Sequence, residues 1–403
     1  MLKKTLYALS IMSVSTMALA SGYQISEYST TSLGRSFAGA GVVGDDFSAI
    51  GYNPAGMSVN ATNGAQFGAA GILLHSDYRN NKDGEKHSSK MGRVLPHFFG
   101  QYKLNEQITV GAGIYTPYGL VTDYNNNWFG NAHGTLSELK AVNFSPAISY
   151  KPHKMIALGA SLNVQYADAR LTSVASDLKG HDTTSLGYSL GVVVTPKENI
   201  RLGISYRSEV DHKIKGDVKT VAGKYDISAK ITTPELVLFS GAFDVNKNLT
   251  LSASARWTRW SRFKDLDVIV DEPMPVGPGT TVPAGYPISK THENWKNTWF
   301  YSVGADYKIN ENWTVRLGAA YDETVIKAPE YRTVRVPDGR RIFASIGLSY
   351  MTGNWQYDLG YTHVWMNGGD ATGKDKLNLV PAPDVHYNNA GAYMGGFSVQ
   401  YKF

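Results

Sequence analysis

Hydrophobic and polar residues alternate with a period of two along much of the chain. In residues 156–166 the even-numbered positions carry Ile, Leu, Ala, Leu, Val and Tyr, whereas the odd-numbered positions carry Ala, Gly, Ser, Asn and Gln. Residues 200–207 and 313–322 repeat the pattern, with small, polar or charged side chains on the second face. Because successive side chains of a strand point to opposite faces, the alternation predicts β-strands with one apolar face.

Fourteen such segments follow one another along the chain. They lie near residues 64–74, 93–103, 107–116, 137–151, 155–170, 183–195, 200–213, 225–243, 249–264, 293–308, 313–325, 340–351, 354–366 and 391–403. Short polar turns alternate with longer connections, as transmembrane antiparallel β-barrels require on their periplasmic and outer sides. The pattern therefore predicts an all-β barrel of 14 strands. A soluble sandwich is the alternative, but it would point its larger apolar side chains inward.

The first residues have a different pattern. Lys3 and Lys4 precede an apolar run that ends near Met17, and an Ala-Leu-Ala step ends at Ala20. These features predict a secretory signal peptide over residues 1–20, with an N-terminal membrane anchor as the alternative.

Composition and charge agree with an exported barrel. The chain has 41 Gly, 25 Tyr and no Cys, and no apolar run after the signal could cross a bilayer as a helix. Its formal net charge of +5 is too balanced to indicate nucleic-acid binding. The ten His show no metal-binding spacing, and a G-x-S-x-G match at 187–191 lies in an alternating segment instead of a strand-to-helix turn. We expect no enzyme, cofactor or metal.

Residues 21–62 precede the first predicted strand and contain strong turn signals. The stretch GDDFSAIGYNPAGM (44–57) holds two adjacent acids, three glycines and an Asn-Pro step. The segment is too short to build its own core, yet it carries apolar residues such as Phe37 and Phe47. Since a barrel of this size has an interior to fill, we predict that the segment lies inside and blocks it. A disordered periplasmic tail is the alternative.

At this point the sequence resembles a known family. The motif residues of the first segment are Leu-Gly-Arg at 33–35, Asp45, Asp46, Asn53, Pro54 and Ala55. They are similar to the N-terminal hatch of the FadL/TodX family, and TPYGLVTDY (116–124), TRWSRF (258–263) and VPDGRR (336–341) resemble later family segments in the same order. The resemblance implies a monomeric bacterial outer-membrane channel for long-chain fatty acids or other hydrophobic compounds. A barrel over 63–403 would be plugged by a hatch over 21–62.

The resemblance also implies a route for the cargo. The ligand would land in a groove between outer loops, enter an internal pocket, rearrange the hatch and leave sideways where the third strand kinks. Pro117, Tyr118 and Gly119 match that kink, and a proline removes a ladder donor. A plain strand end entering a loop is the alternative.

Three residues are candidate ligand contacts on the same grounds. Lys296 has inward parity and resembles a basic group that meets the ligand head; a solvated or lipopolysaccharide-bound lysine is the alternative. Tyr23 matches an aromatic ligand contact, with an ordinary anchoring aromatic as the alternative. The second basic position of the family matches Ser173, so Arg170 is only a nearby substitute. This departure leaves room for neutral aromatic or aliphatic hydrocarbons.

Other partners follow from the barrel itself. Alternation up to the terminal aromatic Phe403 resembles the signal that barrel-assembly machinery reads, and outer-membrane lipid and lipopolysaccharide would surround the wall. A loop-mediated adhesin or phage receptor is a further alternative function. Several charged residues alternate inward and are predicted to form lumen networks, some with Asp45 or Asp46; they are Arg201, Arg207, Glu209, Arg256 and Arg316.

Overall fold

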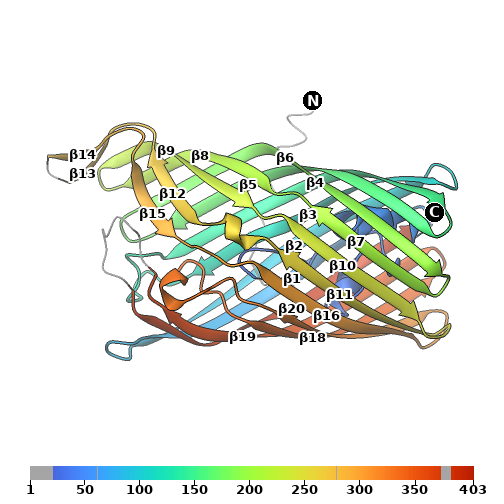
Figure 1. Cartoon of the computed structure of the whole chain (residues 1–403). Helices are drawn as coiled ribbons and strands as arrows, with labels where there is room; N and C mark the ends of the chain where they lie inside the picture. Colours follow the sequence, from blue (N-terminus) through green and yellow to red (C-terminus); the bar gives the residue numbers. More distant parts are fainter. Residues whose placement is uncertain (1–20, 61, 278, 374–382) are drawn as a thin grey trace.

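The first and last strands of the chain pair with each other and close a barrel (Figure 1). The computed structural model describes residues 21–60, 62–277, 279–373 and 383–403, so the predicted signal peptide lies outside the described residues. The closing ladder runs antiparallel from Gly64, opposite Lys402, to Asn80, opposite Val385. Both ends of the barrel wall therefore lie at the same rim, as an even number of strands requires.

The wall consists of long antiparallel strands. They are β1 (Gly64–Asn80), β2 (Lys86–Lys103), β3 (Ile108–Asp123), β4 (Leu136–His153), β5 (Ile156–Thr172), β6 (Asp177–Lys197), β7 (Ile200–Arg207), β8 (Val210–Thr220), β9 (Gly223–Thr233), β10 (Leu236–Asp244), β11 (Leu249–Thr258), β12 (Asp265–Val270), β15 (Pro287–His292), β16 (Thr298–Lys308), β17 (Trp313–Asp322), β18 (Arg341–Thr352), β19 (Trp355–Ala371) and β20 (Val385–Lys402). A separate hairpin, β13 (Met274–Gly277) with β14 (Thr280–Val282), projects from one rim (Figure 1).

Four wall strands are each interrupted once, so each of them appears as two shorter strands. When each such pair is counted as one strand, the wall has the predicted 14 strands. The interrupted pairs are β7/β8, β9/β10, β11/β12 and β15/β16. Their breaks lie side by side, because Arg207, Leu236, Thr258 and Thr298 form one cross-strand row directly beside them. The prediction of continuous strands was wrong here. Pro234, which lacks an N–H, accounts for one break.

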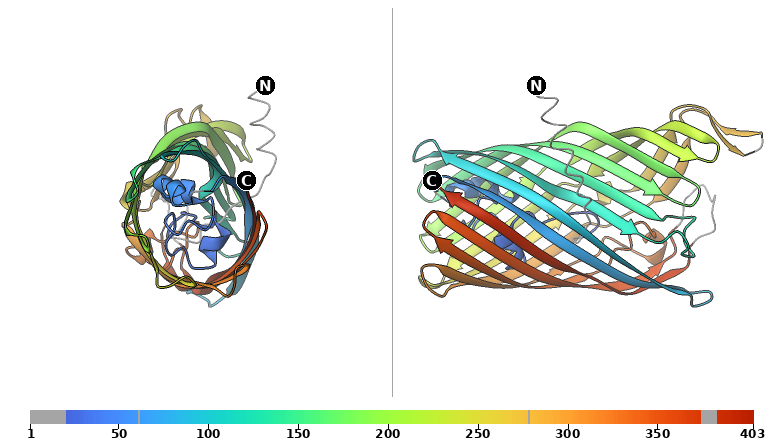
Figure 2. Two further views of the ribbon diagram at one scale, coloured as in Figure 1. Left: turned by 90° about the vertical axis from the view of Figure 1, so that its right-hand side faces the viewer. Right: turned by 180° about the vertical axis from the view of Figure 1, so that it is seen from behind.

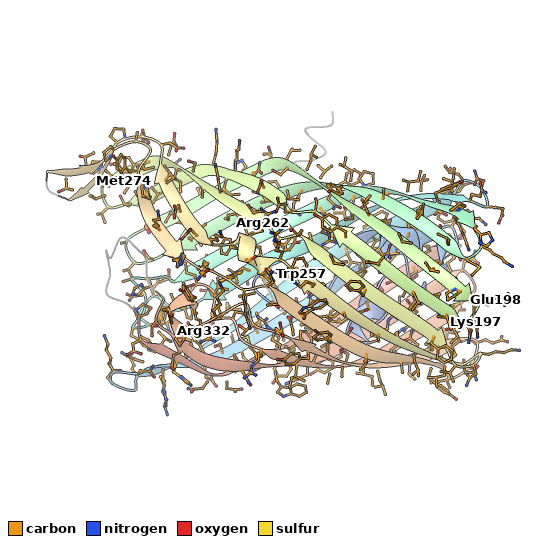
Figure 3. All side chains as sticks on the ribbon, in the orientation of Figure 1. Lys197, Glu198, Trp257, Arg262, Met274 and Arg332 are labelled. Carbon is orange, nitrogen blue, oxygen red and sulfur yellow. The ribbon has the colours of Figure 1, made fainter. Side chains whose placement is uncertain are left out.

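The alternation of faces is confirmed by exposure. Ile156, Leu158 and Leu162 point outward, whereas Asn163 and Gln165 are almost completely buried inside. Side chains project outward from the wall along the whole barrel (Figure 3). Lys197 and Glu198 lie at the end of the barrel that carries the short turns. An apolar outer surface and a polar interior are typical of a barrel in a lipid bilayer.

Residues 21–60, which we call the N-terminal segment, lie inside the barrel ring (Figure 2). The segment contains α2 (Thr30–Leu33), α3 (Ala49–Tyr52) and the 3₁₀ turn η1 (Pro54–Ser58). Two further 3₁₀ turns, η2 (Trp260–Arg262) and η3 (Pro329–Tyr331), belong to the connections. Among the described residues, no helix has the length and apolar character needed to cross a membrane.

Candidate ligand site

The barrel wall is not hydrogen-bonded between β2 and β3 over part of its height. Pairing of these strands starts at Lys103 and stops where Phe98 lies opposite Ile114. Beyond that point the described residues of the two strands share one hydrogen bond, from Ser89 Oγ to the carbonyl oxygen of Asp123 (2.6 Å), near the outer rim. We call this unpaired stretch, residues 90–97 of β2 and 115–122 of β3, the seam.

A missing donor explains why pairing stops there. The N–H of Leu104 donates to the oxygen of Ile108 (2.9 Å) at the turn, so even-numbered residues of β2 face β3. Pro96 is the next even-numbered residue after Phe98, and it has no N–H to offer. Pro96 was not among the residues predicted to interrupt the wall, although its position in the alternation indicated this edge.

A bulge in β3 lies beside the same seam. Tyr115 pairs with Asn143 of β4 and Tyr118 with Ala141, so β3 holds one extra residue over this step. The predicted kink residues Pro117, Tyr118 and Gly119 fall at or directly after this irregularity. β3 is buried on both faces over residues 115–119, as expected for a strand displaced toward the lumen.

The N-terminal segment occupies the edge of β3 that β2 leaves free. The N–H of Ile25 donates to Pro117 and the N–H of Gly119 donates to Tyr23, both at 2.8 Å, around a bridge between Gln24 and Tyr118. Three residues of the segment thus take the place of β2 in the ladder. In lipid, unpaired backbone groups are costly, so this contact stabilises the kinked strand.

Tyr23 lies at the centre of an aromatic cluster. Its ring is 4.7 Å from Trp260, 5.6 Å from Phe263, 5.7 Å from Trp295 and 6.1 Å from Tyr118, measured between centroids. The two tryptophans and Phe263 come from the aligned breaks in β11/β12 and β15/β16, which release them from strand geometry. The Tyr23 hydroxyl donates to the carbonyl oxygen of Thr232 (2.9 Å), which fixes the ring.

The first residue of the N-terminal segment, Ser21, is hydrogen-bonded to β17 of the barrel wall. Ser21 donates its N–H to Asp322 Oδ2 (2.6 Å) and its hydroxyl to Oδ1 (2.7 Å). Asp322 is completely buried and also lies 3.7 Å from the Arg341 guanidinium. A buried carboxylate requires such partners, so this position is firmly held.

An ion network fixes the middle of the segment to the wall. Asp45 pairs with Arg35 (2.7 Å) and with Arg316 of β17 (3.0 Å), and Asp306 of β16 contacts the same two guanidiniums at 3.1 and 3.7 Å. Burial alone would raise the pKa of Asp45, but the two guanidiniums outweigh it and hold that pKa below its usual range. Asp46 serves inside the segment instead, accepting from Ser29 and Thr31.

The Asn-Pro-Ala turn, residues 53–55, packs directly against the backbone of glycines in the barrel wall. Asn53 Oδ1 accepts from the N–H of Ala55 (3.1 Å), and Asn53 Nδ2 donates to Val192 (3.2 Å). Glycines of the inner wall make room for it, since a Cβ at Gly159 would overlap Ala55 and one at Gly191 would overlap Asn53. These inward-facing glycines position the turn. The alternation of apolar and polar residues along the strands could have identified them as inward-facing.

A family profile matches the chain over nearly its whole length. The family described as outer membrane protein transport protein (OMPP1/FadL/TodX) covers residues 11–403. The chain belongs to this family. It is therefore a channel-type transporter of hydrophobic substrates in the bacterial outer membrane and not an enzyme.

Curated relatives are similar to the chain over nearly its whole length, and solved structures share its fold. The chain is 28% identical to the 47 kDa outer membrane protein of Pasteurella multocida, over 99% of this chain and 98% of the relative. It is 25% identical to the long-chain fatty acid transport protein of Escherichia coli K12, with the same coverage. A Pseudomonas aeruginosa FadL homologue superposes with a TM-score of 0.84 at 21% identity, over 95% of this chain and 100% of that one. The toluene transporter TbuX of Ralstonia pickettii gives 0.66 at 17% identity, over 93% and 98%.

Lys296 lies at the border of the aromatic cluster. It follows the buried Trp295 in the break before β16, and its N–H donates to the oxygen of Val325 (3.0 Å). Its side chain is half-buried, and no carboxylate of the described residues forms an ion pair with it. The inward orientation predicted for Lys296 assumed that the alternation of strand faces extends to this residue. β16 begins only at Thr298, so the alternation does not apply at Lys296.

Arg170 is not brought to the cluster. Its guanidinium donates to both oxygens of Asp177, at 2.9 and 2.8 Å, and its side chain is 47% exposed. It continues the outward parity of β5, and the paired carboxylate already satisfies it. The expectation that Arg170 contacts the ligand is therefore not supported by its position.

Of the predicted lumen charges, only some pair with the N-terminal segment. Arg316 does so through Asp45, whereas Arg201 pairs with Asp244 on the neighbouring strand. Glu209 pairs with Arg262. Arg207 and Arg256 contact the segment through oxygen atoms that carry no charge. Among the described residues, no group of three or more His, Asp or Glu could hold a metal ion.

Proposed function

We propose that the protein takes up long-chain fatty acids by passive diffusion across the outer membrane. The observation that carries the proposal is the adjacency of the Tyr23 cluster to the seam, through the backbone bonds of residues 23–25 to β3. An apolar site thus adjoins the part of the wall where β2 and β3 do not pair. The 25% identity to the long-chain fatty acid transport protein of Escherichia coli supports this cargo.

In this proposal the cargo enters from outside between the outer loops and binds among the aromatic side chains. Binding displaces Tyr23 and its neighbours from the edge of β3, so the N-terminal segment acts as a hatch. The cargo then leaves sideways through the seam. A lateral exit suits a molecule whose apolar chain is more stable in lipid than in water.

Lys296 is the proposed contact for the carboxylate during entry. It lies next to Trp295, is half-buried, and has no carboxylate partner among the described residues. A charge-assisted hydrogen bond from its ammonium group to the ligand would add specificity for acids. We further propose that the barrel works as a monomer, with lipopolysaccharide and outer-membrane lipid around it, after insertion by barrel-assembly machinery.

A neutral aromatic or aliphatic hydrocarbon is the second candidate cargo. The specific observation that favours it is the engagement of Arg170 by Asp177, together with Ser173 at the other expected basic position. A site with fewer cations has less preference for acids.

Direct binding to purified protein separates the two candidates. Oleate and a neutral hydrocarbon are each titrated against the wild type and Lys296→Ala. Oleate binding that weakens about tenfold in the variant supports the fatty-acid channel. Binding of the hydrocarbon alone supports the second candidate, and binding of neither contradicts the transport proposal.

A further inference from the structure

A groove lies on the lipid-facing surface of the wall, over β1, β2, β19 and β20. Its volume is about 710 Å³, within the range of roughly 300–1,000 Å³ that is typical of ligand sites. The described residues that line it all belong to these four strands. The groove is therefore separate from the Tyr23 cluster inside the barrel.

Glycines form the floor of this groove. Gly71 of β1 pairs with Gly395 of β20, and the flanking positions of the same row carry Tyr361 on β19 and Val94 on β2. A Cβ added at Gly395 would meet nothing within 4 Å, and one at Gly71 would meet only the oxygen of Gly395 at 3.7 Å. The floor is thus exposed backbone between larger apolar side chains. This shape fits a linear apolar chain.

Aromatic rings gather at the outer end of the groove. His75 stacks on Tyr393 with 5.4 Å between ring centroids, and His363 lies 4.8 Å from Tyr393 and 4.0 Å from Trp365. We call these four residues the aromatic belt. Aromatic side chains form girdles at both interfaces of a membrane barrel. The belt therefore marks the outer border of the hydrocarbon region.

The distance to a second aromatic pair agrees with this placement. Trp355 and Tyr401 lie 4.6 Å apart near the other rim, and Tyr401 pairs with Ala65, ten residues before His75 on β1. Ten residues span about 33 Å along a strand, or roughly 25 Å along the barrel axis at a tilt of about 40°. The apolar band of an outer-membrane barrel has about this height. Gly71 therefore lies in the outer half of the bilayer.

Basic side chains continue the same outward face from the belt to the tip of the β1–β2 hairpin, which reaches the rim opposite to the C-terminus (Figure 2). Lys90 lies opposite His75, and Arg79 lies directly opposite Lys86. Like charges directly opposite each other are destabilising, and an anion between them would offset the repulsion. All three basic side chains are exposed, and none forms an ion pair with another described residue.

The acids near these three basic residues do not neutralise them. Glu85 pairs with His87 (2.7 Å). Asp77 shares the outward face and accepts from Asn389 (3.4 Å). From the belt outward, the described outward positions of β1 and β2 thus carry three permanent positive charges and one negative charge. An apolar groove that ends at unpaired cations matches a lipid with an anionic head group.

We propose that this surface binds the lipid A part of lipopolysaccharide, a phosphorylated glycolipid with several acyl chains. One acyl chain lies along the glycine floor, and a phosphate group meets the three basic residues. Lipid A suits this position because it belongs to the outer leaflet. The inference does not depend on the cargo of the channel. Gly92 and Val94 line the groove and also belong to the seam, so the bound lipid lies against the free edge of β2.

The test measures lipid binding to purified protein by native mass spectrometry, after lipid that co-purifies has been removed. The probes are lipid A, dephosphorylated lipid A and phosphatidylethanolamine. We expect lipid A to bind the wild type at least about tenfold more tightly than either of the other two. Equal affinity for all three would mean that the surface takes up any acyl chain, which overturns the proposal.

Filling the floor tests the acyl-chain half of the site. Gly71→Leu should lower the affinity for lipid A about tenfold. Gly241→Leu, at an outward-facing glycine of β10 where a Cβ meets Leu202 only at 3.5 Å, is the matched control and should bind lipid A as the wild type does. Gly395→Leu replaces Gly71→Leu if that variant does not fold. If the groove instead holds a second copy of the chain, the spectra will show dimers that Gly71→Leu abolishes.

Removing two cations tests the phosphate half. Lys86→Gln/Lys90→Gln should lower the affinity for lipid A about tenfold and leave the affinity for dephosphorylated lipid A unchanged. The matched control is Lys213→Gln/Lys230→Gln, which changes another directly opposed pair of cations, on β8 and β9. An equal loss in this control would indicate non-specific attraction and overturn the site. Lipid A affinity that is indifferent to the floor substitution or to the paired substitution of Lys86 and Lys90 also overturns it.

Discussion

The backbone nitrogen of Ser21 lies 2.6 Å from Oδ2 of Asp322. If the signal peptide is removed after Ala20, as predicted, this nitrogen becomes the positively charged α-amino group of the mature protein. The contact would then be a buried ion pair, and cleavage itself would complete the attachment of the N-terminal segment to β17.

Asp322→Asn removes the negative charge of this contact. Because Asp322 is completely buried and also faces Arg341, we expect the substitution to weaken the attachment by about 3 kcal/mol. The expected result is a higher ion conductance in planar bilayers, since the segment leaves its position more often. Asp177→Asn, at a partly exposed pair on the outer side, is the control. Equal conductance of the two variants would contradict the role of Asp322.

Glu27 gives the N-terminal segment a dependence on pH. Burial raises its pKa from 4.5 to about 7, so between these values the seated segment binds a proton that the released segment does not. Its attachment is therefore strongest below pH 4.5, weakens as the pH rises to about 7, and is constant above that. The full difference is roughly 3 kcal/mol.

Conductance at pH 5 and pH 8 measures this dependence. We expect more leakage at pH 8 in the wild type and a smaller difference in Glu27→Gln. Glu106→Gln, at an exposed turn, should behave like the wild type. A Glu27→Gln profile identical to the wild-type profile would show that Glu27 is not the group responsible.

Inward glycines should tolerate no side chain where the segment touches them. Gly191→Val would push a methyl group into Asn53, whereas Gly395→Val meets nothing within 4 Å on the outer face. We expect Gly191→Val to displace the Asn-Pro-Ala turn and to raise the exchange of backbone amides in residues 44–58, with a penalty of about 2 kcal/mol. Hydrogen exchange by mass spectrometry compares the two. Equal protection in both variants would mean that the close approach is not required.

Restoring the ladder should close the seam. Deleting Thr116 removes the extra residue of β3, and Pro96→Val returns the missing donor to β2. We expect the combined variant to take up labelled oleate at least about tenfold more slowly in cells while the purified protein still binds it. Pro146→Val, at a lipid-facing position of β4, is the control. Undiminished uptake would place the exit elsewhere.

The number of strands could be predicted because alternation is a local property, set by each residue and its neighbours. The aligned breaks could not, since they depend on Trp260 and Trp295 packing against Tyr23 from a distant part of the chain. The same breaks explain why the orientation of Lys296 could not be predicted from the sequence. The alternation of strand faces does not continue through irregular backbone. Arg207 and Arg256 were correctly assigned to the lumen, but the absence of their counter-charges is a property of the folded protein alone.

The contacts of the N-terminal segment join parts of the chain that are far apart in sequence. Thr362 of β19 donates to the oxygen of Leu33, and Ser345 of β18 contacts Ser36, across more than 300 residues. The N-terminal segment thus packs against strands that lie near the C-terminal end of the chain. Contacts so distant in sequence form late. If residues 1–20 are a cleaved signal peptide, as predicted, residues 21–60 enter the periplasm before every strand of the wall, and their contacts with β18 and β19 form only after those strands have arrived.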